Sequence, residues 1–166
     1  ALAAHEPWRA VSAIGVHYSA QHLAANLAGA AVVAGFGAVA ALPARCAGAW
    51  LAAWPLTQFG LLARPDLAHY GGLSGVLHAG VAIAALFLIA RGTRAQRGLG
   101  AAVLAGVGLK LVAEAPWGAA LRAVPGWDIA VAPFAHVSGV VAGALCALVV
   151  LAWPRAGVPG PRSAPR

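Results

Sequence analysis

A serine lies among glycines in the segment HYGGLSGVLHAG, residues 69–80 of an otherwise very apolar chain. Gly72 and Gly75 flank Ser74, and because glycine has no Cβ, another helix or a peptide backbone can approach the hydroxyl closely. Ser74 also begins an apolar run, so we expect it in the first turn of a helix, where free N–H groups and the helix dipole favour a developing negative charge. These features predict a nucleophilic serine; a small-residue packing motif is the alternative.

A second polar position is His136, in the segment FAHVSGVVAG. Gly139 and Gly143 are four residues apart and His136 precedes Gly139 by three, so the three share a helix face that can pack closely on another helix. If that other helix carries Ser74, the imidazole reaches the hydroxyl and can activate it as a nucleophile. His78, one turn after Ser74 on the same face, is then placed to contact His136.

No carboxylate stands beside His136 in the sequence. The nearest one, that of Asp128, precedes it by eight residues, which on a helix is about 12 Å. The sequence therefore predicts a Ser–His dyad rather than a triad with an acid.

His22 and Asn26, in the segment WRAVSAIGVHYSAQHLAAN, are four residues apart and share one helix face. Both side chains can donate hydrogen bonds, so both can stabilise an oxyanion together with the backbone N–H of Ser74. A polar pair that holds two helices together is the alternative. Ionisable residues inside a membrane are rare and usually functional, which favours the first interpretation.

The elements that must position these residues are five apolar stretches, and each has close to the ~20 residues that a helix needs to cross a bilayer. They cover residues 17–41, 46–63, 72–90, 98–115 and 129–153. Hydrophobic residues make up 61% of the 166 residues and charged residues only 9%, too few to cover a soluble domain. Because backbone polar groups must be satisfied inside lipid, we expect an all-α, polytopic membrane bundle.

The basic residues indicate which side of the membrane each linker faces. If residues 1–16 lie outside the cytoplasm, seven arginines fall on the cytoplasmic side and three on the outer side, as the positive-inside rule requires. The cytoplasmic set is Arg45, Arg91, Arg94, Arg97, Arg155, Arg162 and Arg166, and the outer set is Arg9, Arg64 and Arg122. The net charge of +7 then reflects topology, and we expect no binding of nucleic acid.

The domain organisation is simple. Residues 1–153 are expected to form one membrane domain, with a loop at 64–71, and the basic, proline-rich tail 154–166 is expected to be disordered. The chain starts abruptly and contains no methionine, so we expect an N-terminal portion, such as a helix, to precede it. Cys46 and Cys146 have no metal-ligand spacing, so we interpret them as small packing residues and expect no metal site.

Taken in order, the segments WR, HxS and HLxxN, then GxSG, then AHxxGxxxG resemble the rhomboid family of intramembrane serine proteases. The resemblance covers residues 7 to about 150. It implies a catalytic pair of Ser74 and His136, with His22 and Asn26 in the oxyanion hole, in a core of six helices of which the first is not visible here. Rhomboids commonly have a tyrosine where this chain has His78, and GLSGVLHAG is similar to the GLSGVLHG of the rhombosortase branch. The segment LKLVAEAPWG, residues 109–118, also resembles that branch.

The rhombosortase resemblance implies a substrate. The expected partners are bacterial surface proteins with a C-terminal tail made of a Gly-Gly motif, one transmembrane helix and a basic end. It implies cleavage without a cofactor, in the inner membrane, at a site open to the periplasm. A glycine-rich segment is a poor helix former, so it can unwind and present an extended bond to Ser74. Whether water or another nucleophile resolves the acyl-enzyme stays open.

Two other functions compete with this one. A catalytically inactive rhomboid-like scaffold would bind transmembrane helices without cleaving them. A haem- or metal-binding membrane protein would use His22, His78 and His136 as ligands, but this leaves Ser74 and its glycines unexplained.

Overall fold

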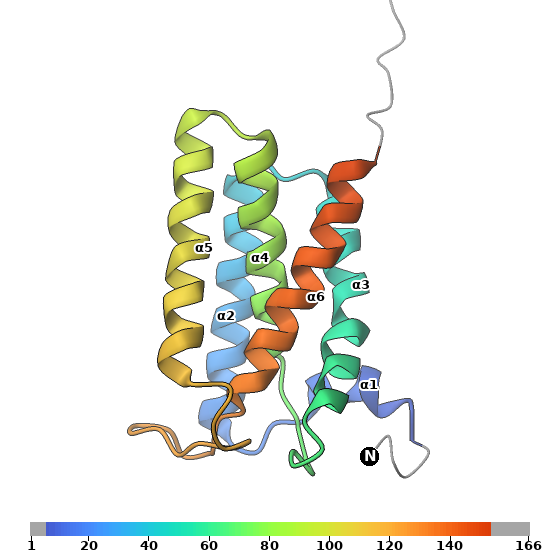
Figure 1. Ribbon diagram of the computed structural model, residues 1–166, viewed down its shortest axis with the longest axis vertical. Coiled ribbons are helices and arrows are strands. Elements are labelled where there is room, and N and C mark those ends of the chain that lie inside the picture. The colour runs from blue at the N-terminus through green and yellow to red at the C-terminus, as the bar shows by residue number, and fades with distance from the viewer. Residues whose placement is uncertain (1–5, 154–166) are drawn as a thin grey trace, which may run out of the picture.

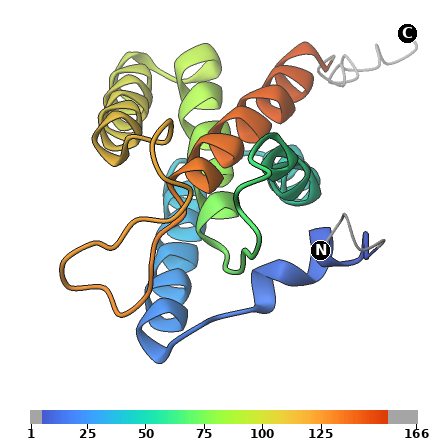
Figure 2. The same cartoon turned by 60° about the horizontal axis from the view of Figure 1, so that its bottom comes forward.

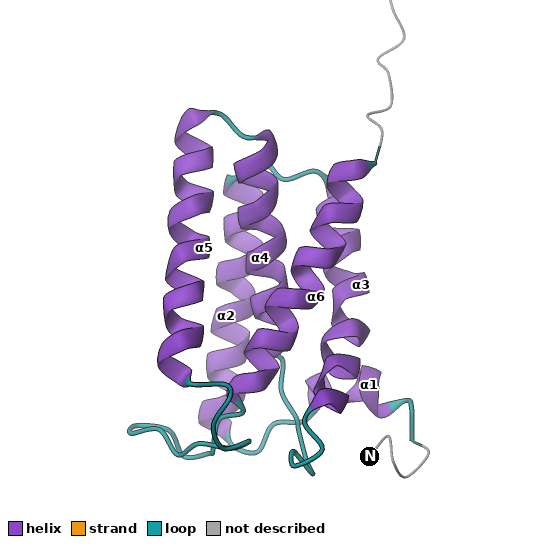
Figure 3. Ribbon diagram, in the orientation of Figure 1, coloured by secondary structure: helices purple, strands orange, loops and turns teal. Residues whose placement is uncertain are grey.

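The computed structural model describes residues 6–153, in which all long elements are helices (Figure 3). This confirms the expected all-α class, while the expected disorder of the tail falls on residues outside the described part. Five long helices form a bundle (Figure 1). They are α2 (Ala20–Val39), α3 (Ala44–Gly60), α4 (Ser74–Arg91), α5 (Arg94–Glu114) and α6 (Pro133–Ala152). The short elements are α1 (Arg9–Ser12), η2 (Ala13–Gly15) and η3 (Leu61–Ala63).

The five helices match the five predicted stretches, with shifted ends. Helix α5 begins four residues before the predicted stretch because Thr93 and Gln96 form a capping box, in which each side chain bonds the other residue's backbone N–H. An apolar count misses this first turn since Arg94 and Arg97 belong to it. Helix α6 begins at Pro133 rather than at 129, because proline suits the first turn of a helix.

Helices α2, α4 and α6 are long and apolar enough to cross a membrane. This composition is that of a membrane protein and supports three of the five predicted spans. The other two are weaker on composition alone, because α3 has only 17 residues and α5 carries four charged side chains. These are Arg94, Arg97, Lys110 and Glu114. Both helices run alongside the three apolar ones (Figure 1).

Helices α4 and α6 form the centre of the bundle and bury ten residues each, whereas α2 buries three. Their backbones touch where they cross: a Cβ on Gly139 would overlap the carbonyl of Gly75, and one on Gly143 would overlap that of Ala79. The prediction that Gly139 and Gly143 make a close packing face is therefore confirmed.

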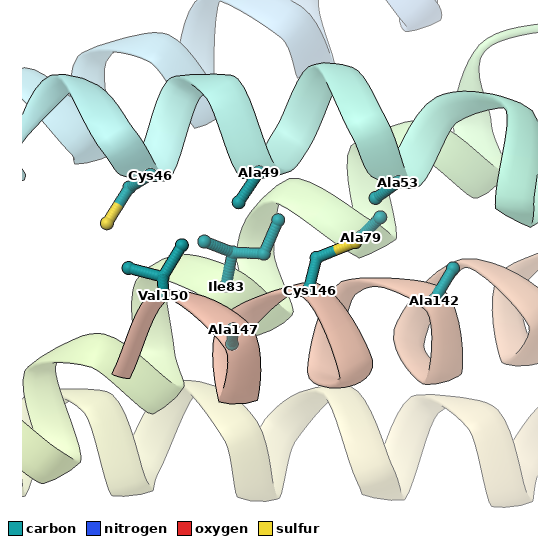
Figure 4. Packing of buried hydrophobic residues seen from close by; sticks show 9 residues of the cluster. All are labelled: Cys46, Ala49, Ala53, Ala79, Ile83, Ala142, Cys146, Ala147 and Val150. Atoms are coloured by element: carbon teal, nitrogen blue, oxygen red, sulfur yellow. The ribbon is translucent and has the colours of Figure 1, made fainter. Parts of the chain in front are cut away.

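Away from the crossing at Gly139, α3, α4 and α6 enclose an apolar core (Figure 4). Cys46 and Cys146 lie in this core as free, buried thiols, as expected for packing residues. Its members are Cys46, Ala49, Ala53, Ala79, Ile83, Ala142, Cys146, Ala147 and Val150.

The two ends of the bundle differ in charge and in the length of the segments that connect the helices. The α2–α3 and α4–α5 connections are short and lie at one end, with Arg45, Arg91, Arg94 and Arg97. The longer segments 61–73 and 115–132 and the segment 6–19 lie at the other end (Figure 2). We call this second end the loop end; it includes the first turns of α4 and α6 and the last turn of α5.

Candidate active site

The structure brings together the two residues predicted to react. Ser74 is the first residue of α4, and His136 lies in the first turn of α6. The Ser74 Oγ is 3.1 Å from the His136 Nε2, within hydrogen-bond reach. His136 is only 5% exposed, so its ring is held by packing.

The close crossing of α4 and α6 produces this contact. A Cβ on Gly75, the residue after Ser74, would lie 2.7 Å from the carbonyl oxygen of Ala135, the residue before His136. The same Cβ would lie 2.9 Å from Thr57 of α3, so three helices meet beside the serine. The absence of a side chain at Gly75 is what lets the two reactive residues approach.

A carboxylate also reaches His136, contrary to the prediction from the sequence. The Glu114 Oε2 lies 2.6 Å from the His136 Nδ1, on the ring edge opposite to Ser74. The expectation that no carboxylate lies beside His136 was wrong, because it considered only carboxylates close to His136 along the chain. Glu114 ends α5, and its position at the end of the stretch 98–115, on the same side as Ser74, was the signal that could have found it.

Asp128, the carboxylate nearest to His136 along the chain, bonds to Ser19. It is not on α6 but in the segment 115–132, where its carboxylate accepts a hydrogen bond of 2.7 Å from the hydroxyl of Ser19. Asp128 therefore anchors the loop to the start of α2.

Lys110 contacts Glu114 and so continues the line of polar side chains that begins at Ser74. Its Nζ donates to the Oε1 of Glu114 at 2.5 Å, so the two oxygens of that carboxylate serve different partners. The Nζ also lies 3.3 Å from the His136 Nδ1. Because the nearer Glu114 oxygen accepts the proton of Nδ1, the Nε2 of His136 is free to accept one from Ser74.

His78 stacks on His136, as expected. The two ring centroids are 4.2 Å apart and the rings are 16° from parallel. The His78 Nδ1 lies 2.7 Å from the carbonyl oxygen of Ser74, so this nitrogen carries a proton and donates it to the carbonyl. His78 thus fixes one face of the His136 ring.

His22 and Asn26 converge on the backbone just before Ser74. Both are buried, 6% and 4% exposed. A Cβ on Gly72 would lie 2.5 Å from the His22 Nε2 and 3.3 Å from the Asn26 Nδ2, so both nitrogens face this glycine. Gly72 has a φ of +114°, a conformation that favours glycine, and the Asn26 Nδ2 has no hydrogen-bond partner. A buried donor without a partner is available for a ligand oxygen.

Side-chain hydrogen bonds tie the loop end together. Gln21 of α2 donates to the carbonyl of Gly126, and Arg64 donates to the carbonyls of Pro116 and Gly118. Arg64 also hydrogen-bonds Asp66, which lowers the pKa of that carboxyl. The segment 115–132 is therefore held from both sides of the site.

The histidines are not arranged as metal ligands. Among residues 6–153, no three His, Cys, Asp or Glu side chains come close enough to hold a metal ion. His78 and His136 lie face to face, so their nitrogens point along parallel planes instead of at one point.

No family model, no curated protein and no solved structure matches this chain. The interpretation of the site therefore depends on its own geometry, in which a hydroxyl, an imidazole and a carboxylate lie in one row beside two buried donors.

Proposed function

We propose that this protein is an intramembrane serine protease of the rhomboid type, close to the rhombosortase branch. The observation that carries the proposal is the 3.1 Å contact between the Ser74 Oγ and the His136 Nε2 at the loop end of an apolar helical bundle. Glu114 contacts the imidazole of His136 on the side away from Ser74. The start of α4 offers free backbone N–H groups.

The chemistry follows from these contacts. His136 accepts the Ser74 proton at Nε2 while the Ser74 oxygen bonds to the scissile carbonyl carbon, and the carbonyl electron pair moves to its oxygen. When the intermediate collapses, the C–N bond breaks and His136 returns the proton to the leaving amine. Water then attacks the acyl-enzyme with His136 again as the base, and Ser74 regains its proton.

The oxyanion is stabilised by donors that are already oriented. The Asn26 Nδ2 and the His22 Nε2 face Gly72, and α4 begins two residues later, at Ser74, with the free backbone N–H groups of its first turn. Since the Asn26 donor has no other partner, it loses no hydrogen bond when it binds the oxyanion.

The proposed substrates are single-pass proteins with a glycine-rich C-terminal tail, cleaved in the bacterial inner membrane. The arginines at the end opposite to the site favour a cytoplasmic location for that end, so the loop end opens to the periplasm. A Gly-Gly segment unwinds at low cost and leaves an extended backbone for Ser74.

The first test uses a fluorophosphonate probe, which forms a covalent bond with activated serines. The purified full chain is expected to be labelled, and Ser74→Ala and His136→Ala to remain unlabelled. Ser138→Ala is the matched control, because Ser138 is a buried serine whose hydroxyl donates to the carbonyl of Thr57. Labelling of Ser74→Ala would show that another residue reacts with the probe and would contradict the proposal.

The second test is co-expression with a membrane protein that carries a Gly-Gly tail, a transmembrane helix and a basic end. The wild type is expected to shorten the substrate, and Ser74→Ala to leave it intact. Binding without cleavage by the wild type would instead support the inactive scaffold.

A further inference from the structure

We propose that Glu114 is a positioning residue which converts the Ser–His pair into a Ser–His–Glu triad, and that Lys110 fixes the orientation in which Glu114 acts. The inference rests on the proposed protease function. It assigns a role to a carboxylate on α5, a helix that has only Gly100 buried and otherwise contributes little to the core.

The contacts around the imidazole determine its tautomer. Ser74 meets Nε2 at 3.1 Å and Glu114 meets Nδ1 at 2.6 Å, so the ring is held at both nitrogens. A carboxylate is an acceptor only, so the neutral ring keeps its proton on Nδ1 and exposes the lone pair of Nε2 to Ser74. When Nε2 takes the serine proton, the negative Glu114 stabilises the imidazolium.

The backbone of Glu114 is held in place as well. Arg122 donates to the carbonyl oxygens of Ala113 and Glu114, and the next residue, Ala115, ends the helix in the left-handed region. Arg122 also pairs with Val131, two residues before α6 begins. This bridge ties the end of α5 to the start of α6 and so keeps Glu114 beside His136.

An ordinary surface ion pair is the simpler interpretation of Glu114. Lys110 and Glu114 are four residues apart on one helix, the spacing at which exposed pairs form. Glu114, however, divides its two oxygens between Lys110 and His136, and its side chain is 23% exposed whereas that of Lys110 is 45% exposed. The charged and titratable groups that face His136 are His78 from α4 and Lys110 and Glu114 from α5.

Lys110 makes the proposal testable through the amide of Glu114→Gln. Lys110 can only donate, so in this variant the amide oxygen turns to Lys110 and the amide NH₂ turns to the His136 Nδ1. That donor forces the ring proton onto Nε2, where it blocks proton transfer from Ser74. Without Lys110, the amide can turn over and accept from Nδ1 again.

The experiment compares Glu114→Gln, Lys110→Met and the double variant in the full chain, by the rate of fluorophosphonate labelling. We expect Glu114→Gln to lower the maximal labelling rate about 10²–10⁴-fold, as the wrong tautomer does in serine proteases, with probe affinity nearly unchanged. The double variant should recover at least about tenfold over Glu114→Gln. Because both variants carry the same substitution at Glu114, any loss of fold it causes affects both alike.

Two results separate this inference from the proposed function. If Ser74→Ala abolishes labelling but Glu114→Gln keeps the wild-type rate, Glu114 has no positioning role and the Ser–His pair stands alone. If the double variant is as slow as Glu114→Gln, the tautomer argument is wrong. If the wild type itself is not labelled, both the proposed function and the role of Glu114 are wrong.

Discussion

Helices α4 and α6 have two halves that differ in chemistry. Toward one end they bury only apolar side chains, such as Ile83 and Val150, in the shared core (Figure 4). Toward the loop end they bury the polar residues His136 and Ser138 as well as apolar ones. The same pair of helices therefore builds a core at one end and holds the polar residues of the site at the other.

The polar half leaves donors unpaired, which a stable core avoids. At the loop end the Asn26 Nδ2, the Gln58 Nε2 and the Tyr70 hydroxyl are buried without a hydrogen-bond partner, and at the opposite end the Arg45 Nε is buried in the same way. An unpaired buried donor costs about 1–3 kcal/mol, so each one in a native protein calls for a reason such as a catalytic role or a bound water or ion. The apolar half therefore stabilises the bundle, while the loop half keeps the polar groups that the proposed function uses. The cavity of about 310 Å³ between α2, α3 and α4, lined by Leu42 and Trp50, belongs to the apolar half and not to the site.

The largest effect on the loop half is expected at the crossing of α4 and α6. Gly139→Ala places a methyl group against the Gly75 carbonyl and pushes α6 away from α4. A shift of about 1 Å in a reacting group can cost 10²-fold, so we expect cleavage to slow by at least about that factor. The matched control is Gly106→Ala on α5, where a methyl group meets open space and the rate should not change. Equal rates for both variants would contradict the role of the crossing.

A second test removes the polar contribution of α2. Asn26→Ala deletes the unpaired donor that faces Gly72 and should lower the catalytic rate about 10²-fold, the usual cost of losing one oxyanion donor. The substrate affinity should change little, because the bond forms mainly in the transition state. Leu27→Ala, at a neighbouring residue that is 60% exposed, is the control and should keep the wild-type rate. A higher KM with an unchanged kcat in Asn26→Ala would contradict the oxyanion role of Asn26.

A third test weakens the apolar half alone. Ile83 is 2% exposed in the core, and Ile83→Ala should lower the free energy of unfolding by about 2–5 kcal/mol. The rate per folded molecule should stay within about threefold of the wild type, because distant sites act independently. Thermal unfolding in detergent and cleavage rates measured on the same samples check both statements. A large fall in the rate per folded molecule would show that the two halves are coupled.

The smallest expected effect concerns the anchoring of the loops. Hydrogen bonds from Arg64 lower the pKa of the Asp66 carboxyl, so this pair stabilises the folded state above the ordinary pKa of an aspartate. The contribution is lost as the pH falls through the lowered pKa, when Asp66 becomes protonated. The melting temperature of the wild type should therefore fall slightly more in acid than that of Asp66→Asn. Parallel curves would mean that the pair contributes nothing.

Several parts of the molecule could be predicted from the sequence. Apolar runs predicted five helices, because such a run depends only on neighbouring residues along the chain. The spacing of Gly139 and Gly143 predicted a close helix face, and the polar residue types around Ser74 predicted the kind of chemistry. The predicted starts of α5 and α6 were wrong by four residues each, since capping by Thr93 and the start at Pro133 are not visible in hydropathy.

Composition and short spacings along the chain are enough to give an apolar helical protein with its basic residues at one end and most of its polar residues at the other. Which of the polar residues meet depends on the way the helices pack. The contact of Glu114 with His136 spans 22 positions, and His22 and Asn26 face Gly72 across about fifty, so each depends on how whole helices pack. Packing is set by the fit of many side chains at once, which no local pattern encodes.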